Sequence, residues 1–141
     1  TGADALNEAT ILAKKGRRVQ LETVIGQDDA GKFIQAHCDD AGIMVRDACI
    51  KKDEKTGMNI VLVEQDGTRS FLTNPHGTLR SLKVEHIQMP FPESAKIVCF
   101  ASIFVFPKIG PDKLVQIFSQ AKMQGKIVCA YITKRKKVDT L

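Results

Sequence analysis

Apolar residues recur at helical spacing in three stretches of the chain. The first stretch aligns Ala5, Leu6, Ala9, Leu12 and Ala13, the second Ala30, Phe33, Ile34, Cys38 and Ala41, and the third Leu114, Ile117, Phe118 and Ala121. Each stretch ends near a glycine, at Gly16, Gly42 or Gly125, and glycines often end helices in left-handed backbone. Asp28 or Asp29 is placed to cap the second stretch. The pattern predicts three amphipathic helices, each packed on a core through its apolar face.

Short apolar runs between these stretches predict strands. They lie at residues 19–25, 95–106 and 126–132, and the middle run is interrupted only by Lys96 and Ser102. A nearly continuous apolar run is typical of a strand that is buried on both faces. Because strands and helices alternate, the expected fold class is α/β, with a Rossmann-like parallel sheet flanked by helices.

The pattern changes to short strands with turn signals between residues 43 and 73. Residues 44–50, 58–64 and 68–73 predict strands, and Gln65-Asp66-Gly67 predicts a hairpin turn between the last two. We therefore expect a small antiparallel β lid at 43–73, inserted into an α/β core formed by 1–42 and 74–141.

The chain opens on a turn where a strand is expected. In doubly wound α/β folds the first strand normally lies inside the sheet and leads into the first ligand loop. We therefore expect the first strand to lie outside these 141 residues, so that the chain is a fragment of the core.

The formal net charge of +5 is concentrated near the end of the chain. From residue 126 onward, five cations face one anion, Asp139, so this segment supplies +4 and the preceding residues only +1. Few aromatic residues accompany the cluster for base stacking. Nucleic-acid binding through residues 134–137 is thus a minor alternative, behind a phosphate or acidic ligand and a solvated segment.

Membrane and secretion signals are not apparent in the pattern. No apolar run approaches the about 18–20 residues of a membrane span, and no basic segment precedes a short apolar one. Cys38, Cys99 and Cys129 lie among apolar residues without a C-x-x-C pair, which predicts reduced core thiols. We expect a cytoplasmic protein with no membrane partner.

Two further kinds of site are disfavoured by the residue types. Residues 26–33 match a phosphate-binding G-x-x-x-x-G-K loop, but Phe33 stands where a Mg²⁺-ligating Ser or Thr belongs, and the helix pattern places Phe33 in the core. His37, His76 and His86 are isolated and do not suggest a metal centre. We interpret His37 as a packed histidine and His76 as a surface histidine.

The start of the chain carries the strongest candidate for ligand binding. A turn that brings backbone N–H groups, Asp4 and Asn7 to a helix N-terminus suits a polyhydroxylated ligand, because these groups accept and donate in fixed directions. The alternative is an ordinary helix that Asp4 caps.

Several short motifs resemble those of ribokinase-like (PfkB-type) carbohydrate kinases. They are Gly2-Ala3-Asp4-Ala5-Leu6-Asn7, Val24-Ile25-Gly26 through Gly31, Ala41-Gly42-Ile43, Thr56-Gly57, Asp66-Gly67-Thr68-Arg69 and Asn74-Pro75-His76-Gly77. They occur in the family's order and together cover essentially the whole chain. The resemblance implies a ribokinase-like fold and phosphoryl transfer from ATP, with Mg²⁺, to a sugar hydroxyl.

The resemblance also implies site residues. Gly2, Asp4 and Asn7 would bind the sugar, Arg69 and Asn74 would act from or near the lid, and Arg135 would contact the sugar or a phosphate. The family's G-A-G-D run, with its catalytic base, and its N-x-x-E element do not occur here. The C-terminal half of the core is therefore expected beyond Leu141, and no ATP or Mg²⁺ is expected on this chain alone.

Two residues depart from the family pattern, and the function stays open in two respects. Ala3 occupies the second glycine position, and Tyr131 stands where a D-x-N-x-R segment begins. Fructose, ribose, a keto-deoxy sugar acid and a nucleoside all remain candidate substrates. The main alternative is a non-catalytic α/β module that binds a ligand or forms a homodimer through its lid, an arrangement that some family members use.

Overall fold

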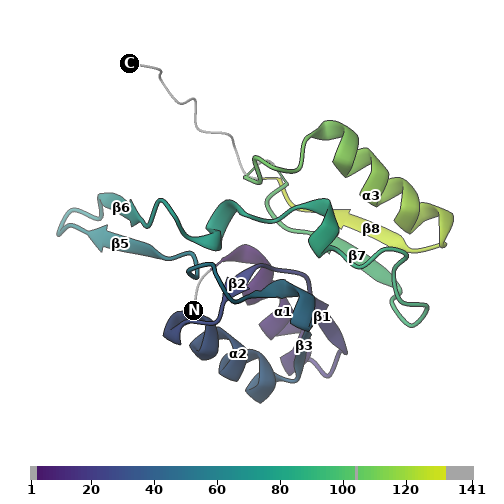
Figure 1. Cartoon of the computed structure of the whole chain (residues 1–141), viewed down its shortest axis with the longest axis horizontal. Helices are drawn as coiled ribbons and strands as arrows, with labels where there is room; N and C mark the ends of the chain where they lie inside the picture. The colour runs from purple at the N-terminus through teal and green to yellow at the C-terminus, as the bar shows by residue number, and fades with distance from the viewer. Residues whose placement is uncertain (1–2, 104, 133–141) are drawn as a thin grey trace.

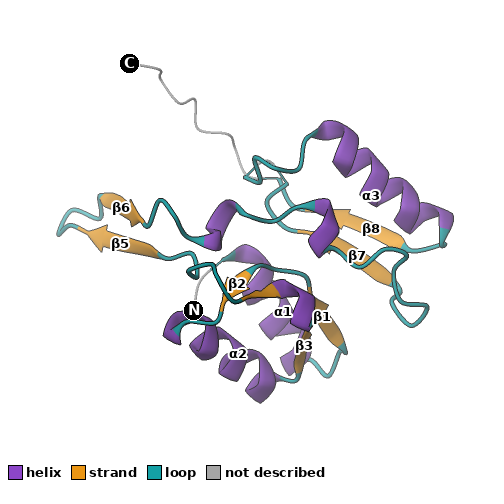
Figure 2. Cartoon of the chain, viewed as in Figure 1, coloured by secondary structure: helices purple, strands orange, loops and turns teal. Residues whose placement is uncertain are grey.

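The computed structural model describes residues 3–103 and 105–132 and shows a mixed α/β chain of helices and short strands (Figures 1 and 2). The helices are α1 (Asp4–Lys14), α2 (Asp29–Ala41) and α3 (Pro111–Met123). The strands are β1 (Val19–Leu21), β2 (Ile25–Gly26), β3 (Ile43–Val45), β4 (Ile50–Lys51), β5 (Asn59–Val63), β6 (Arg69–Thr73), β7 (Ile97–Phe100) and β8 (Ile127–Ala130). Short 3-10 turns lie at Asp47–Cys49, Thr78–Arg80 and Val84–His86. The three predicted helices are confirmed.

The ends of α2 follow the local sequence signals. Asp28 caps the helix through Oδ1, which accepts a 3.0 Å hydrogen bond from the Gly31 backbone N–H. Gly42 ends α2 in left-handed backbone with φ 70°. The start of α1 differs, because Ala3 precedes the helix, no side chain caps it, and Asp4 lies inside its first turn. The interpretation of Asp4 as a helix cap is therefore wrong.

Three strand pairs are parallel and one is antiparallel. β1 pairs with β3, β2 with β4, and β7 with β8 in parallel, whereas β5 and β6 pair antiparallel. The prediction of an antiparallel strand at 44–50 was wrong, because β3 and β4 extend the parallel pairs and a 3-10 turn separates them. Ile43 is buried beside β1, and burial of that side chain draws the segment into the core. The division into a core and a lid at 43–73 stays a prediction.

The β5–β6 hairpin projects from the rest of the molecule (Figure 1). Its turn is closed by a 3.0 Å hydrogen bond from the Gly67 N–H to the Glu64 carbonyl, and Gly67 has φ 85°. The Asp66 carboxylate accepts a 2.8 Å hydrogen bond from the Thr68 N–H. Every residue of both strands is exposed. The predicted hairpin and its turn are confirmed.

Two hydrophobic clusters hold the helices against the parallel strands. One lies among α1, α2, β1 and β3 and contains Leu6, Ala9, Leu21, Cys38 and Ile43. The other lies between α3 and the β7–β8 pair and contains Val24, Leu82, Ile87, Phe91, Phe100, Ile109, Ile117 and Ala121. Val24 comes from the segment between β1 and β2, so it connects the start of the chain to the second cluster. Within residues 3–103 and 105–132, no helix has the length and apolar character that a bilayer span requires.

The apolar run at 95–106 is not one long strand. β7 ends at Phe100, a turn follows, and only one face of the β7–β8 pair packs on α3. Ile97 on the other face is 58% exposed. The predictions of a doubly buried strand and of core thiols at Cys99 and Cys129 were wrong, since both thiols are exposed on that face.

Two other side chains also differ from their expected burial. Phe33 is 65% exposed, because α2 turns Ile34 and Cys38 inward and leaves Phe33 beside that stripe. Cys49, which the pattern did not single out, is fully buried.

Candidate functional site

The Asp28 carboxylate joins the start of α2 to the segment that leads into the hairpin. Its Oδ1 accepts from the Gly31 N–H and from the Thr56 hydroxyl at 2.5 Å, and its Oδ2 accepts from the Thr56 N–H at 2.9 Å. The Thr56 hydroxyl in turn accepts a 3.0 Å hydrogen bond from the Gly26 N–H, and Thr56 is 2% exposed. The Thr56 hydroxyl, followed by the backbone donors, lowers the pKa of Asp28 below its usual value. Asp28 therefore acts as an ionised structural anchor.

This carboxylate also decides whether a nucleotide fits the turn at residues 26–33. In a phosphate-binding loop, free backbone N–H groups at the helix N-terminus meet the phosphate. Here Asp28 pairs with the Gly31 N–H and places a negative charge at that end of α2. The described residues do not fit ATP at this turn, in agreement with the sequence argument.

Two glycines of the family-like motifs, Gly31 and Gly57, lie where the backbone approaches itself closely. A Cβ at Gly31 would lie 1.9 Å from the Gly26 carbonyl oxygen, and a Cβ at Gly57 would lie 2.2 Å from the Leu79 backbone nitrogen. Only glycine fits at these two positions without displacing backbone. The motifs thus build the junction between the parallel strands and the hairpin.

Asn74 closes the base of the hairpin. Its Oδ1 accepts a 2.7 Å hydrogen bond from the Met58 N–H, and its Nδ2 donates at 3.1 Å to the Thr56 carbonyl. Beside it, the buried Thr78 hydroxyl accepts a 3.0 Å hydrogen bond from the Gly57 N–H. The Asn74 amide, directly after β6, is therefore fixed to the segment that leads into β5.

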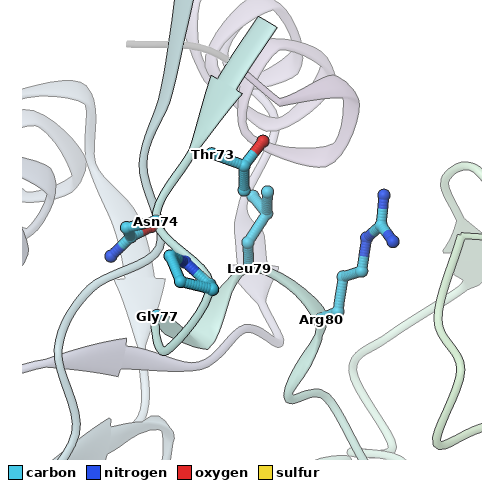
Figure 3. A pocket seen from close by; sticks show the side chains of 6 residues that line it. Thr73, Asn74, Gly77, Leu79 and Arg80 are labelled. Carbon is cyan, nitrogen blue, oxygen red and sulfur yellow. The ribbon is translucent and has the colours of Figure 1, made fainter.

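A pocket of about 200 Å³ opens at this base (Figure 3). Its lining consists of Thr73, Asn74, Pro75, Gly77, Leu79 and Arg80. Figure 3 shows the Leu79 side chain pointing toward Thr73, with the Arg80 side chain extending beside them. The Thr73 hydroxyl donates to Asn59 Oδ1 and the Asn74 amide bonds Met58 and Thr56, so the Arg80 guanidinium and the apolar wall are the groups that this pocket offers to a small polar ligand.

The other candidate residues at the start of the chain, Asp4 and Asn7, share the first turn of α1. Both are exposed, and a three-residue spacing places them on neighbouring positions of the helix surface. The Ser102 hydroxyl donates a hydrogen bond to Asp4 Oδ2. One turn further along α1, Glu8 Oε2 accepts a 3.4 Å hydrogen bond from the Cys99 thiol. Although Cys99 is exposed overall, partial desolvation of its thiol beside α1, followed by this hydrogen bond, raises the pKa of the thiol to about 11. α1 is therefore docked on β7 and on the turn that follows it.

Ala3 has φ 95° and ψ 138°, in a region that side chains rarely adopt. This backbone conformation explains why a glycine suits the position in the resembling motif. Ala3, which replaces the second glycine of the family motif, is thus a strained residue directly before Asp4.

Arg69 and Asn74 lie at opposite ends of β6. Arg69 is exposed beside the hairpin turn, opposite Val63, whereas Asn74 follows the strand at the hairpin base. Gly2 and Arg135 lie outside the described residues, as does the basic cluster at 134–137. Asp4 is hydrogen-bonded to Ser102, and Asn74 is hydrogen-bonded to Thr56 and Met58. Among the described residues, these hydrogen bonds do not connect the Asp4 site to the Asn74 site.

The histidines have structural surroundings. His37 Nε2 lies 3.0 Å from the Thr10 hydroxyl between α1 and α2, and His76 is exposed, as the sequence predicts. His86 is buried, and its Nδ1 accepts a 3.0 Å hydrogen bond from the Lys83 N–H. Burial, followed by the charge of Lys51, lowers the pKa of His86. No cluster of three metal-ligating side chains occurs in the part of the chain that the structure describes.

Sequence reasoning missed two polar residues that organise these sites. In the sequence Thr56 stands out only as part of the Thr56-Gly57 motif, and no local signal indicates that it is buried. Ser102 was visible as a hydroxyl that interrupts an apolar run, and that interruption is a signal of a turn or of a polar contact.

The parallel strand pairs, the helices packed on them and the projecting hairpin define an α/β fold of the ribokinase-like kind. The chain belongs to the pfkB family of carbohydrate kinases, whose family model matches residues 1–140. The resemblance drawn from the motifs is confirmed.

Solved structures show the same fold at low sequence identity. A fructokinase from Xylella fastidiosa matches with a TM-score of 0.75 and 23% identity over 98% of this chain and 46% of its own. A PfkB protein from Polaromonas sp. JS666 has a TM-score of 0.76 and 21% identity, over 94% and 46% of the two chains. A putative ribokinase II from E. coli matches with a TM-score of 0.77 and 19% identity, over 94% of this chain and 43% of its own. The chain spans less than half the length of each of these proteins.

Proposed function

We propose that this chain is the sugar-facing part of a cytoplasmic, ATP-dependent carbohydrate kinase that transfers the γ-phosphoryl group to a sugar hydroxyl. The family match over residues 1–140 is the observation that carries the proposal. Gly2, Asp4 and Asn7 bind sugar hydroxyls in this proposal, and Arg69 and Asn74 act from the hairpin and its base. Arg135 contacts the sugar or a phosphate.

The chemistry of the described residues supports these roles. Asp4 presents a carboxylate and Asn7 an amide from one exposed helical turn, so the two accept and donate toward one ligand. The hairpin-base pocket adds the Arg80 guanidinium beside Asn74. A hydroxyl-rich ligand satisfies such a mixture of donors and acceptors.

ATP and Mg²⁺ are assigned in this proposal to residues outside the chain. The described residues offer no free helix N-terminus for phosphate at Asp28 and no cluster of metal ligands. Phosphoryl transfer needs a base for the sugar hydroxyl and donors around the moving group. This chain alone is therefore expected to bind sugar without phosphorylating it.

The test compares the 141-residue chain with the protein expressed from its complete reading frame. ADP release is measured with ATP and Mg²⁺ against fructose, ribose, a keto-deoxy sugar acid and a nucleoside. We expect turnover by the complete protein and background by the chain. Turnover by the purified chain that disappears in Asn7→Ala would contradict the fragment assignment. A complete protein that neither binds nor phosphorylates any of these compounds would favour the non-catalytic module.

A homodimer through the hairpin is a second proposal, and the apolar character of both hairpin faces favours it. By strand alternation, Ile60, Leu62 and Leu72 share one face, while Val61, Val63 and Phe71 share the other, and all are exposed. One face can cover a ligand while the other meets a second copy. Analytical ultracentrifugation of Leu62→Lys and of Val61→Lys tests this arrangement. A dimer that neither variant dissociates, or a monomeric parent, would exclude it.

A further inference from the structure

Ser102 occupies an unusual backbone position two residues beyond β7. Its φ is 54°, in the left-handed region that favours glycine, and the residue is 6% exposed. The surrounding hydrogen bonds fix this conformation: the Val105 N–H donates to the Ser102 carbonyl at 3.0 Å, and the Ile103 N–H donates to the Tyr131 carbonyl at 3.2 Å. A serine here has a steric cost that a glycine would avoid.

The hydroxyl that serine adds at this position reaches Asp4. The Ser102 hydroxyl donates to Asp4 Oδ2, although the two residues are 98 positions apart. A side-chain hydroxyl carried by a buried turn restrains the rotation of the carboxylate to which it donates. Asp4 is otherwise an exposed side chain on the first turn of a helix, with free rotation about its side-chain bonds.

A second side-chain contact joins α1 to β7. The Cys99 thiol donates to Glu8 Oε2, and Glu8 lies one helical turn after Asp4. Together the two contacts place the start of α1 at the carboxyl end of β7. Ligands of open α/β sheets bind at the carboxyl ends of the strands.

We propose that Ser102 is a positioning residue that orients the Asp4 carboxylate toward the sugar hydroxyl. The proposal rests on the proposed function, in which Asp4 binds sugar. Ser102 itself holds one carboxylate oxygen and leaves the other for the ligand. A purely structural serine at this site would be replaceable by glycine without loss of sugar affinity.

Two substitutions separate positioning from folding. Both Ser102→Ala and Ser102→Gly remove the hydroxyl, but Ser102→Gly also relieves the positive φ and is expected to keep or raise the Tm. In the complete protein we expect both variants to raise KM for the sugar about tenfold. KM for ATP is expected to stay at the parent value in both variants, and the Tm of Ser102→Gly is not expected to fall below that of the parent. Ser119→Ala, an exposed serine on α3, is the control.

The sugar KM of the double variant Asp4→Ala/Ser102→Gly distinguishes a positioning role of Ser102 from a purely structural one. If Ser102 acts through Asp4, adding Ser102→Gly to Asp4→Ala leaves the sugar KM unchanged. An unchanged sugar KM in Ser102→Gly, or full additivity in the double variant, would overturn the inference while leaving kinase activity in place. A parent protein that phosphorylates no sugar would overturn the proposed function, and the inference with it.

Discussion

The Thr56 hydroxyl donates a 2.5 Å hydrogen bond to Asp28 Oδ1 across 28 positions of sequence. The same hydroxyl accepts from the Gly26 N–H, and the Thr56 carbonyl accepts from Asn74. One buried residue therefore connects the end of β2, the start of α2 and the base of the hairpin. Because its partners are a backbone N–H, an ionised carboxylate and a side-chain amide, the connection is directional as well as buried.

Thr56→Val should destabilise the protein by about 1–3 kcal/mol. Valine keeps the shape but leaves the Gly26 N–H and one Asp28 oxygen without their buried partner. The measurement is the urea midpoint at constant slope. The matched control is Thr68→Val, whose hydroxyl bonds Asp66 at an exposed turn and should contribute less than about 0.5 kcal/mol. Equal losses in the two variants would contradict the anchoring role of Thr56.

Asp4→Ala should weaken sugar binding about 10- to 100-fold, because a charge-assisted hydrogen bond is lost. ATP affinity should stay unchanged. The Tm should fall modestly, because the buried Ser102 hydroxyl loses its acceptor although Asp4 caps no helix. Titration calorimetry with melting curves measures all three quantities. Asp112→Ala, in the first turn of α3, is the control for a helix-terminal carboxylate. Unaltered sugar affinity together with a lowered Tm would show that Asp4 is structural only.

Ala3→Gly should stabilise the protein by about 1 kcal/mol. The substitution removes the Cβ that is strained at φ 95°, and this relief exceeds the added entropy of glycine in the unfolded chain. Chemical denaturation gives the change in free energy of unfolding. Ala36→Gly, exposed inside α2, should instead destabilise by about 0.5–1 kcal/mol. A loss of stability in both variants would mean that Ala3 is unstrained.

His86 should make stability fall as the pH drops below its unfolded pKa of 6.5. Burial lowers the folded pKa, with Lys51 adding to the effect and Glu85 opposing it. The unfolded chain therefore takes up a proton near 6.5 that the folded chain accepts only at lower pH. His86 contributes full stability above 6.5 and loses it as the pH falls through the folded pKa.

The comparison of urea midpoints at about pH 7.5 and about pH 5 tests this dependence. His86→Asn should reduce the difference between the two midpoints. His76→Gln, at an exposed histidine, should leave the difference as in the parent. A parent whose midpoint does not change between these pH values would exclude the expected role of His86.

The features that the sequence predicted well depend on signals within a few residues. Gly42 and Gly67 have the left-handed backbone that ends α2 and turns the hairpin, and Asp28 caps the helix that follows it. The spacing of apolar residues was sufficient for the three helices. The family motifs identified the fold because their glycines satisfy close backbone approaches at Gly31 and Gly57.

The features that the sequence did not predict depend on contacts between residues that are far apart along the chain. Ile97 and Cys99 are as apolar as Phe100, yet nothing in their neighbourhood says that only the Phe100 face meets α3. Likewise, the parallel pairing of β3 depends on β1, which lies more than a helix away along the chain. The local sequence pattern shows that a residue is apolar, whereas its burial depends on which helix or strand packs against it.

The candidate site was predictable in part. Asp4, Asn7 and Asn74 were identified by motif, but the contacts that fix Asp4 and Asn74 come from Ser102, Thr56 and Met58. Such contacts join residues far apart in sequence and leave no periodic trace. The roles of these residues toward a sugar remain proposals that the experiments above address.

The β5–β6 hairpin is attached to the rest of the molecule through its base, so the length of the hairpin can change without altering the packing of the other elements. Both strands leave a junction fixed by Thr56, Asn74 and Thr78, and their outer residues meet solvent. Because side chains alternate with a period of two, adding or removing two residues in each strand keeps every face intact and moves only the tip. Related proteins can therefore change how far this arm reaches, and what it touches, without repacking either hydrophobic cluster.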